Sequence, residues 1–394
     1  MVDRPDDVAL TGGGPSRPVL TDRRSMRIVI GGGGTAGHVY PGLAAAATLR
    51  ERGHEVTFVG TERGVESRLV PAAGFDLRIL EAAPFVRRPS VAALRAPVVA
   101  LRATGRCQEY VRGADVVVGM GGYVSVPAVM AARREGVPVV LHEQNAVPGL
   151  ANRVLSRVAA SVGVAFSDAA GRFPRRSRPR IVVTGNPVRP EIRSVPLDRD
   201  ALAKEARQDL GLDDDRRTVV IFGGSQGALH IDQAAAGACR LLADREDLQV
   251  VLITGLAHLE DTRRGLMPSG SLVVRTFGYV DRMDLAYACA DLVVSRAGAT
   301  TIAEVTVCGL PALLIPYPHA TGRHQEANAR SLQRAGGASV LVDPQLSAAT
   351  LAERIDALIG HEERLAAMAE RSAAFGQPDA AERLADLTTQ AAGS

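Results

Sequence analysis

The sequence predicts an α/β protein with two Rossmann-like domains, each built on a doubly wound parallel sheet, that face each other across a cleft. Its 394 residues exceed what one ordinary core accommodates, which favours two domains. Short apolar, β-branched runs alternate with alanine-rich stretches, which indicates βαβ units and parallel sheets. Each half also contains a strand, a glycine-rich turn and a helix in succession, so the same design is used twice.

The first half carries the elements of one complete sheet. Its expected strands are Arg27–Gly32, Glu55–Gly60, Asp76–Leu80, Asp115–Gly119, Pro138–Leu141, Ser161–Val164 and Ile181–Thr184. Its expected helices are Gly37–Arg50, Val91–Arg112, Ser125–Arg134 and Gly149–Val158.

The pattern restarts after the turn residues Gly185–Pro187. A helix at Arg199–Leu210 leads into the strand Thr218–Phe222. Further strands are expected at Leu248–Ile253, Leu272–Arg275, Asp291–Ser295, Ala312–Ile315 and Ser339–Val342, and closing helices at Ala348–Ile359, Glu362–Ala374 and Asp379–Gln390.

These patterns divide the chain into an N-terminal domain at 26–185 and a C-terminal domain at 186–370. Residues 1–25 are rich in Asp, Arg, Gly and Pro, and we expect them to form a disordered tail. We expect residues 371–394 to form a helix that packs back toward the N-terminal domain.

The composition argues against several classes of protein. The four cysteines are scattered and form no C-x-x-C pair, which disfavours a disulfide framework or a zinc site and fits a reducing cytoplasm. Aromatic residues make up 4% and Trp is absent, so a nucleic-acid partner that depends on base stacking is not expected. The sequence shows no signal-peptide pattern, and no run approaches about 18 apolar residues, so we expect no membrane span.

Two glycine-rich turns, Gly31–His38 and Gly223–Gly227, predict sites for phosphate. Glycine lets the backbone approach a ligand, and the following helix offers free N–H groups and a positive dipole end. The first turn also fits the dinucleotide fingerprint G-x-G-x-x-G, but Glu62 lies beyond the position where that fingerprint requires an acid. A nucleotide sugar is therefore favoured over NAD or FAD, and a tight turn without a ligand is the remaining alternative.

Polar runs follow two strands of the first half, at the edge where open α/β sheets bind ligands. They are Gly119–Ser125 and His142–Asn145. Four consecutive polar side chains at 142–145 are costly to bury, so we expect them to meet solvent or a ligand.

The second half adds further polar groups. Gly298–Thr301 is expected to open a helix and to favour phosphate. Glu304, one turn later, can accept from both ribose hydroxyls or complement the helix dipole. Arg189, near the domain boundary, can bind a diphosphate through two hydrogen bonds or be solvated.

Six motifs, taken in order, resemble the MurG family of GT-B-fold N-acetylglucosaminyltransferases (glycosyltransferase family 28). They are Gly34–His38, Gly121–Ser125, His142–Asn145, Gly185–Arg189, Gly223–Ala228 and Arg296–Ala299. The resemblance runs from about residue 26 to the C terminus. It implies an inverting enzyme of peptidoglycan synthesis that moves GlcNAc from UDP-GlcNAc to the C4 hydroxyl of MurNAc in undecaprenyl-diphosphate-linked muramyl-pentapeptide. In this reaction lipid I becomes lipid II.

The resemblance also implies roles for individual residues. The donor site would contain Thr35, Ala36, Gly37, Asn145, Arg189, Gly224, Ser225, Gln226, Val280, Ala299, Thr300, Thr301, Glu304 and Gln325. Within it, Ser225 would hold diphosphate, the Val280 backbone would meet uracil and Glu304 would bind ribose. The acceptor would contact Gly34, Tyr123 and His142. Ala297 and His324 depart from the family pattern, which puts single sugar contacts in question rather than the reaction.

A single displacement at the anomeric carbon needs a base for the acceptor hydroxyl and charge stabilisation for departing UDP. His38 is the first candidate base, because an unperturbed histidine has a pKa of about 6.5. Glu143 is the second, and a capping or acceptor-binding role is the alternative for His38. Helix N termini and Arg189 can meet the leaving-group charge, so no cofactor and no essential metal are expected. Asp198–Asp200 and Asp213–Asp215 fit the D-x-D metal motif, but we interpret them as a helix cap and a solvated turn.

Basic residues surround apolar ones in residues 84–112, which contain only one acid, Glu109. Residues 171–180 add five arginines and no acid. This pattern suits an anionic membrane surface, although a solvated arginine-rich face is the more common arrangement. With the resemblance, it implies peripheral attachment to the cytoplasmic face of the plasma membrane, with other cell-wall synthesis proteins as candidate partners. The arginines expected to make the contact are Arg87, Arg88, Arg95 and Arg102.

Three other functions compete with this interpretation. One is a GT-B glycosyltransferase that uses a UDP-sugar on another lipid or a natural product. A second is an NAD-dependent oxidoreductase, disfavoured by the missing acid and by the second glycine turn. A third is a nucleotide-sugar-binding protein, which would bind UDP-GlcNAc without turnover.

Overall fold

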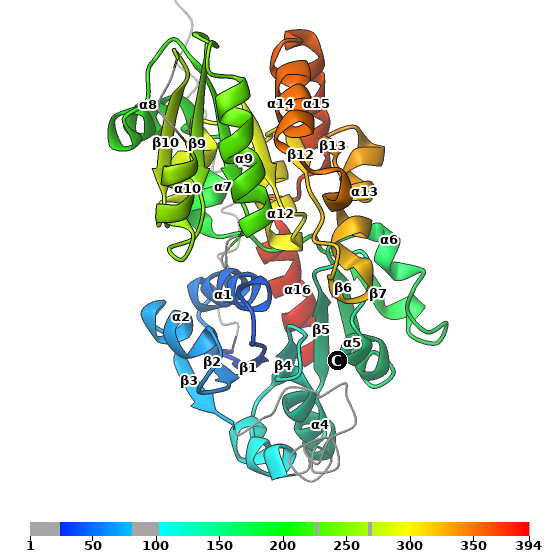
Figure 1. The fold of residues 1–394 in the computed structure, drawn as a ribbon. Helices are drawn as coiled ribbons and strands as arrows, with labels where there is room; N and C mark the ends of the chain where they lie inside the picture. Colours follow the sequence, from blue (N-terminus) through cyan, green and yellow to red (C-terminus); the bar gives the residue numbers. More distant parts are fainter. Residues whose placement is uncertain (1–23, 81–101, 225–227, 267–269, 394) are drawn as a thin grey trace, which may run out of the picture.

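The computed structural model of the chain describes residues 24–80, 102–224, 228–266 and 270–393. These residues form two parallel β-sheets, one of seven strands and one of six, each covered by helices (Figure 1). The predicted α/β architecture with two parallel sheets is therefore confirmed.

The N-terminal sheet has the strand order β3-β2-β1-β4-β5-β6-β7. Its strands are β1 (Arg27–Gly31), β2 (Glu55–Gly60), β3 (Asp76–Ile79), β4 (Val116–Gly119), β5 (Val139–Glu143), β6 (Ser161–Val164) and β7 (Ile181–Val183). The chain moves outward from β1 to β3 and then returns to β4 on the other side of β1. The order reverses between β1 and β4, and such a switch point leaves a crevice at the carboxyl ends of the strands.

Apolar residues alternate along these strands, and so the sheet carries a core on each face. Ile28 and Ile30 of β1 pack on one face and Val29 on the other. The helices of this part are α1 (Ala36–Glu51), α2 (Glu66–Ala72), α4 (Ser125–Glu135), α5 (Leu150–Leu155) and α6 (Ser167–Ala170), with a further helical segment at 102–111 and a 3-10 helix at Arg178–Arg180. The first part of the predicted helix Val91–Arg112 lies outside the described residues.

The C-terminal sheet repeats the design with the order β10-β9-β8-β11-β12-β13. Its strands are β8 (Arg217–Phe222), β9 (Leu248–Ile253), β10 (Val273–Phe277), β11 (Leu292–Ser295), β12 (Ala312–Leu314) and β13 (Ala338–Val340). Its helices are α7 (Pro190–Ser194), α8 (Arg199–Leu210), α9 (Leu229–Leu241), α10 (Leu259–Gly265), α11 (Met283–Ala288), α12 (Ala299–Val307), α13 (His324–Ala335), α14 (Ala348–Ile359) and α15 (Glu362–Phe375), with 3-10 helices at Thr321–Arg323 and Asp343–Gln345. The switch point here lies between β8 and β11.

The chain passes between the two sheets twice, and the two crossings lie side by side. A Cβ atom on Gly185, where φ is +81°, would come within 2.5 Å of Gln377 Cβ. After the second crossing, α16 (Ala380–Ala392) packs against α1 and against β4, β5 and β6 of the N-terminal sheet (Figure 1). The expected boundary at residue 370 falls inside α15, which packs on α12, α13 and α14.

Candidate active site

A cavity of about 780 Å³ lies between the two sheets. Its lining comes from the segments that follow β1, β5 and β8 to β13, together with Arg189 and α13. The four strands that flank the two switch points are β1, β4, β8 and β11, and the glycine-rich motifs follow these strands. The motifs that looked separate in the sequence therefore gather around one cleft, as the topology of open α/β sheets requires.

The N termini of α1 and α12 face each other across this cavity. Gly298 precedes α12, and its extended backbone leaves the first N–H groups of the helix free to bind a ligand. A Cβ atom on Gly37 of α1 would lie 3.9 Å from Thr300 Oγ1 of α12. That hydroxyl is buried and has no hydrogen-bond partner among the residues that the structure describes. Two positive dipole ends and a free hydroxyl converge here, which is an arrangement that favours an oxyanion.

His38 lies where the two glycine turns of the N-terminal domain meet. Its Nδ1 is 2.9 Å from Thr35 Oγ1. A Cβ atom on Gly121 would come within 3.2 Å of the imidazole ring, and one on Gly122 would come within 3.0 Å of the Gly33 carbonyl oxygen. Both of these glycines have positive φ, which other residues rarely adopt. The pKa of His38 is lowered to about 4, mainly by burial and also by the nearby His324, while the negative charge of Glu66 opposes this decrease.

Most of the polar run His142–Asn145 is buried, whereas the sequence predicted that all four side chains meet solvent or a ligand; only Gln144 and Asn145 line the cavity. His142, Glu143 and Gln144 are at most 2% exposed, because their partners are inside the protein. His142 Nε2 is 2.9 Å from the Gly185 carbonyl oxygen, and Gln144 donates to the Met120 carbonyl oxygen. His142 is thus an internal residue that does not line the cavity, and its contact with the acceptor stays a prediction.

Glu143 is an organising residue of the loop that follows β5. Oε1 accepts from the backbone and side-chain N–H groups of Asn145, at 3.0 and 3.2 Å. Oε2 accepts from the Gly149 backbone at 3.0 Å and from Asn152 Nδ2 at 2.9 Å. Burial raises the pKa of Glu143, and these hydrogen bonds oppose the rise. Glu143 does not line the cavity, so its position does not favour the predicted role as a base.

Asn145 does line the cavity, and Asn328 of α13 holds it there from the other domain. Asn328 Nδ2 donates to Asn145 Oδ1 at 3.2 Å and to the Ala297 carbonyl oxygen at 3.2 Å. Asn328 Oδ1 accepts from the Ala146 N–H at 2.8 Å. One buried amide therefore joins the β5 loop to the segment after β11 across the cleft.

Arg189 and Glu304 form a buried network on the C-terminal side of the cavity. Arg189 Nη2 lies 3.3 Å from Glu304 Oε1, and the Tyr287 hydroxyl donates to Glu304 Oε2 at 2.9 Å. The guanidinium of Arg189 also stacks on the ring of Tyr40, 4.9 Å from its centroid, so a residue of α1 closes this network. Burial raises the pKa of Glu304, and Arg189 opposes the rise.

The structure places most of the predicted donor residues in one cavity. Twelve predicted donor residues and the candidate base His38 belong to its lining; the donor residues are Thr35, Ala36, Gly37, Asn145, Arg189, Gly224, Val280, Ala299, Thr300, Thr301, Glu304 and Gln325. Gly34, Tyr123, His142 and Glu143 lie outside the lining, although the Tyr123 ring covers Gly34 at 3.2 Å from the position of a Cβ atom. Ser225 and Gln226 lie outside the described residues.

Several residues of the site were missed in the sequence. Tyr40, Tyr287 and Glu66 carried no signal, because their partners are distant along the chain. Asn328 carried no signal either, because its partners Asn145 and Ala146 lie in the other half of the chain.

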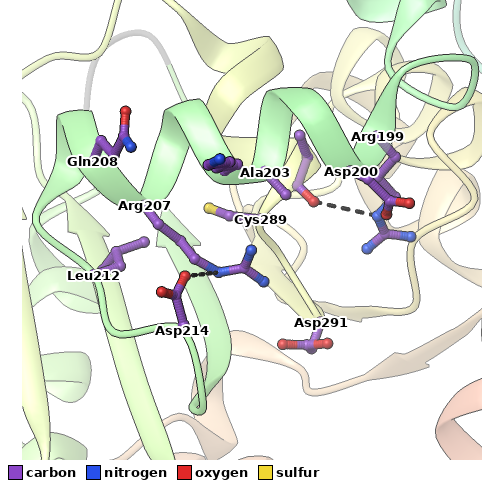
Figure 2. Close-up of a pocket in the computed structure, with 11 residues that line it drawn as sticks. Arg199, Asp200, Ala203, Arg207, Gln208, Leu212, Asp214, Cys289 and Asp291 are labelled. Carbon is purple, nitrogen blue, oxygen red and sulfur yellow. Dashed lines mark hydrogen bonds and ion pairs between the residues drawn. The ribbon is translucent and has the colours of Figure 1, made fainter.

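A second cavity, of about 770 Å³, is lined by α8, by the turn that follows it and by residues at the C-terminal end of α11 (Figure 2). Arg199 donates to the carbonyl oxygens of Ala288 and Ala290. Arg207 Nε lies 3.8 Å from Asp214 Oδ1, as Figure 2 shows. Residues of both D-x-D segments border this cavity, and Asp198 stands at the N-cap position of α8 without a capping bond. In the described part of the chain, no group of three or more His, Cys, Asp and Glu side chains is placed to hold a metal ion. None of the described residues predicted to bind donor or acceptor lines this second cavity.

Comparison with known proteins agrees with this architecture. Residues 28–164 match the glycosyltransferase family 28 N-terminal domain, and residues 218–384 match the C-terminal domain of that family. The chain is 41% identical over 369 residues to the UDP-N-acetylglucosamine–N-acetylmuramyl-(pentapeptide) pyrophosphoryl-undecaprenol N-acetylglucosamine transferase of Halothermothrix orenii, covering 92% of this chain and 98% of the relative. It is 45% identical over 374 residues to the protein of the same name from Acidothermus cellulolyticus, covering 93% and 98%.

The crystal structure of Acinetobacter baumannii MurG superposes with a TM-score of 0.74 at 30% identity, covering 93% of this chain and 99% of that one. The two parallel sheets and the cleft between them thus form the GT-B fold. The chain belongs to glycosyltransferase family 28 and, within it, to the MurG family of N-acetylglucosaminyltransferases.

Proposed function

We propose that this protein transfers GlcNAc from UDP-GlcNAc to the C4 hydroxyl of MurNAc in undecaprenyl-diphosphate-linked muramyl-pentapeptide, with inversion at the anomeric carbon. The names of the relatives support both substrates. The observation that carries the proposal is the convergence of α1 and α12 at Gly37 and Thr300. A UDP leaving group develops charge on its diphosphate, and two helix N termini beside Arg189 can stabilise that charge.

The donor is proposed to bind mainly to the C-terminal domain. Glu304 is buried beside Arg189, where its carboxylate can accept from ribose hydroxyls and Arg189 can reach a phosphate. The backbone around Val280 lines the same cavity and offers an edge for uracil. Gln325 Oε1 accepts from the Tyr317 N–H at 2.9 Å, which turns the amide N–H₂ of Gln325 toward other partners such as sugar hydroxyls.

His38 is the proposed base. Its lowered pKa keeps the imidazole neutral at neutral pH, and a base must be unprotonated. When Nδ1–H donates to Thr35 Oγ1, Nε2 keeps its lone pair and can take the proton of the acceptor hydroxyl. Glu143 is the less suitable candidate, because both of its oxygens already accept hydrogen bonds within the β5 loop.

The oxidoreductase alternative is disfavoured by the first glycine turn itself. A dinucleotide-binding turn uses its free N–H groups to hold a pyrophosphate. Here the Gly34 N–H donates to Glu66 Oε2 at 2.8 Å, so a carboxylate already occupies that donor.

The proposed reaction is tested by supplying the protein with UDP-GlcNAc and either the muramyl lipid or a natural-product acceptor. We expect UDP release and a GlcNAc-containing lipid with the muramyl lipid alone. Turnover only with the other acceptor would favour a different GT-B transferase, and UDP-GlcNAc binding without turnover would favour a non-catalytic protein.

Contact with the cytoplasmic face of the plasma membrane is proposed for the N-terminal domain. Arg87, Arg88 and Arg95 lie outside the described residues, whereas Arg102 is exposed on the helical segment 102–111. On α5, Leu150 and Val154 are 74% and 49% exposed, and they lie one helical turn apart beside the exposed Arg153. Apolar side chains flanked by basic ones suit an anionic bilayer surface. No helix within the described residues is both long and apolar enough to cross a membrane.

The basic residues at 171–180 divide into two groups. Arg178 and Arg180 donate to backbone carbonyl oxygens, including those of Gly171 and Ser156, so they fasten the local chain. Arg172, Arg175 and Arg176 are exposed and are better placed to meet lipid headgroups.

Flotation with anionic vesicles tests the membrane proposal. Reversing the charge of Arg87 and Arg88 to Glu should reduce the bound fraction. The matched control reverses Arg263 and Arg264, an exposed adjacent pair on α10, and should leave binding unchanged. If the variant with Glu at positions 87 and 88 binds vesicles as well as the control does, Arg87 and Arg88 do not contribute to membrane binding.

A further inference from the structure

Glu66 is the first residue of α2, and its fully buried carboxylate contacts the first glycine-rich turn at Gly34. Its Oε1 accepts from the Thr61 backbone N–H at 2.9 Å and from the Thr61 hydroxyl at 2.7 Å. Its Oε2 accepts from the Gly34 N–H at 2.8 Å. The carboxylate thus ties the turn after β2, at Thr61, to the turn after β1, at Gly34, which is 32 residues before Glu66 in the sequence.

Three glycines make room for this side chain. A Cβ atom would lie 2.3 Å from the Glu66 carboxylate if placed on Gly33, 2.1 Å if placed on Gly64, and 2.5 Å from Glu66 Cγ if placed on Gly60. None of these three glycines has a positive φ, so backbone conformation does not require glycine there. The three glycines leave a space that the Glu66 side chain fills, and a side chain at any of these positions would clash with Glu66. We call this space the glycine cradle.

The glycine cradle adjoins Thr35 and His38, two residues of this turn that line the cavity. Gly34 precedes Thr35, the N-cap residue of α1, and Thr35 contacts His38 through its hydroxyl. The peptide unit that Glu66 holds is therefore one residue from the start of the catalytic segment. Glu66 also acts on His38 through space, because its negative charge raises the pKa of that imidazole.

We propose that Glu66 is a positioning residue for the transfer reaction. Through its hydrogen bond to the Gly34 N–H, it fixes the positions of Thr35 and His38 relative to the cavity. This inference rests on the proposed function, because Glu66 is inferred to position His38, the proposed base of that reaction. UDP is proposed to bind mainly to the C-terminal domain, so we expect Glu66 to affect the chemical step more strongly than the affinity for UDP. A residue that only stabilised the fold would have no such selectivity.

The substitution Glu66→Gln tests this role with almost no change in volume. Its amide presents one oxygen and one N–H₂ group, so it cannot accept from both Gly34 and Thr61 as the carboxylate does. We expect kcat to fall about 10- to 100-fold, since a misplacement of about 1 Å at a reacting group can cost about 100-fold. The Kd for UDP and the KM for UDP-GlcNAc are expected to change less than about twofold.

Glu135→Gln is the matched control. Glu135 is a partly buried residue of the same domain whose carboxylate accepts from Gln108 Nε2 at 2.9 Å, away from the cleft. We expect this variant to keep the wild-type kcat even if its thermal unfolding temperature falls.

Thr61→Val provides a second route if Glu66→Gln does not fold. It removes one donor from Oε1 and retains the carboxylate, so we expect a kcat loss of about threefold or more with unchanged UDP affinity. A folded Glu66→Gln or Thr61→Val protein with wild-type kcat would overturn the proposal, as would parallel losses of kcat and UDP affinity. Absence of transfer by the wild-type protein would instead count against the proposed function.

Discussion

Arg189 and Glu304 form an ion pair within the cleft, with 3.3 Å between Arg189 Nη2 and Glu304 Oε1. The Tyr287 hydroxyl occupies the other carboxylate oxygen at 2.9 Å. The residues assigned to diphosphate and ribose thus hold each other in place. Each carboxylate oxygen has two lone pairs, so Glu304 can accept from ribose hydroxyls while it keeps these partners.

We predict that Glu304→Ala weakens UDP binding by about 10- to 100-fold, because a hydrogen bond to a charged group contributes about 1.5–3 kcal/mol. Titration calorimetry with UDP measures the change. Glu353→Ala, an exposed position on α14, is the control and should bind UDP normally. An affinity within twofold of wild type for Glu304→Ala would contradict the ribose assignment.

His38→Ala should lower kcat by about 100- to 10,000-fold, the range expected for loss of a general base. UDP affinity should stay near wild type, because most of the proposed nucleotide contacts lie in the C-terminal domain and His38 is not one of them. His361→Ala, at the N-cap position of α15 outside the cleft, should leave kcat unchanged. Near-normal kcat for His38→Ala would show that another group takes the proton.

The stability of the protein should depend on pH through its buried histidines. Burial lowers the pKa of both His38 and His142 to about 4, against about 6.5 in the unfolded chain. Between these values the unfolded chain binds more protons, so the free energy of unfolding rises with pH in this window. Their contribution is complete above about pH 6.5 and decreases toward pH 4, with a limiting slope of about 1.4 kcal/mol per pH unit for each histidine.

Urea unfolding between pH 5 and 7.5 measures this slope. His142→Gln removes one of the two groups and should give a smaller slope than wild type. An unchanged slope would mean that His142 titrates normally in the folded protein.

EDTA should leave the transfer rate unchanged, because Arg189 and the N termini of α1 and α12 are proposed to meet the leaving-group charge. Rates are compared with and without EDTA and after addition of Mg²⁺. Activity that EDTA abolishes and Mg²⁺ restores would assign the charge stabilisation to a metal.

The sequence was most informative about strands and about the turns that follow them. Buried parallel strands are continuous apolar runs, so β2, β6 and β9 have the predicted bounds. Short helices such as α2 and α11 were missed, because six or seven residues carry too little periodicity and α2 also contains Pro71.

The details of the site depend on partners that the sequence does not bring together. The run at 142–145 looked too polar to bury, yet Asn152, Gly185 and Met120 provide its hydrogen bonds. Glu66 carried no signal because its function arises where two distant turns meet. Spacing along the chain identified the cleft, whereas tertiary contacts decide which polar groups are free to act.

The most direct test of the account is a crystal structure of the protein with UDP-GlcNAc. We predict uracil beside the backbone of Val280, ribose on Glu304, and the diphosphate at the N terminus of α12 next to Arg189. The GlcNAc should then point across the cleft toward His38. A nucleotide bound with its diphosphate on the Gly31–Gly34 turn, or in the cavity between α8 and α11, would contradict the assignment of donor and acceptor to opposite domains.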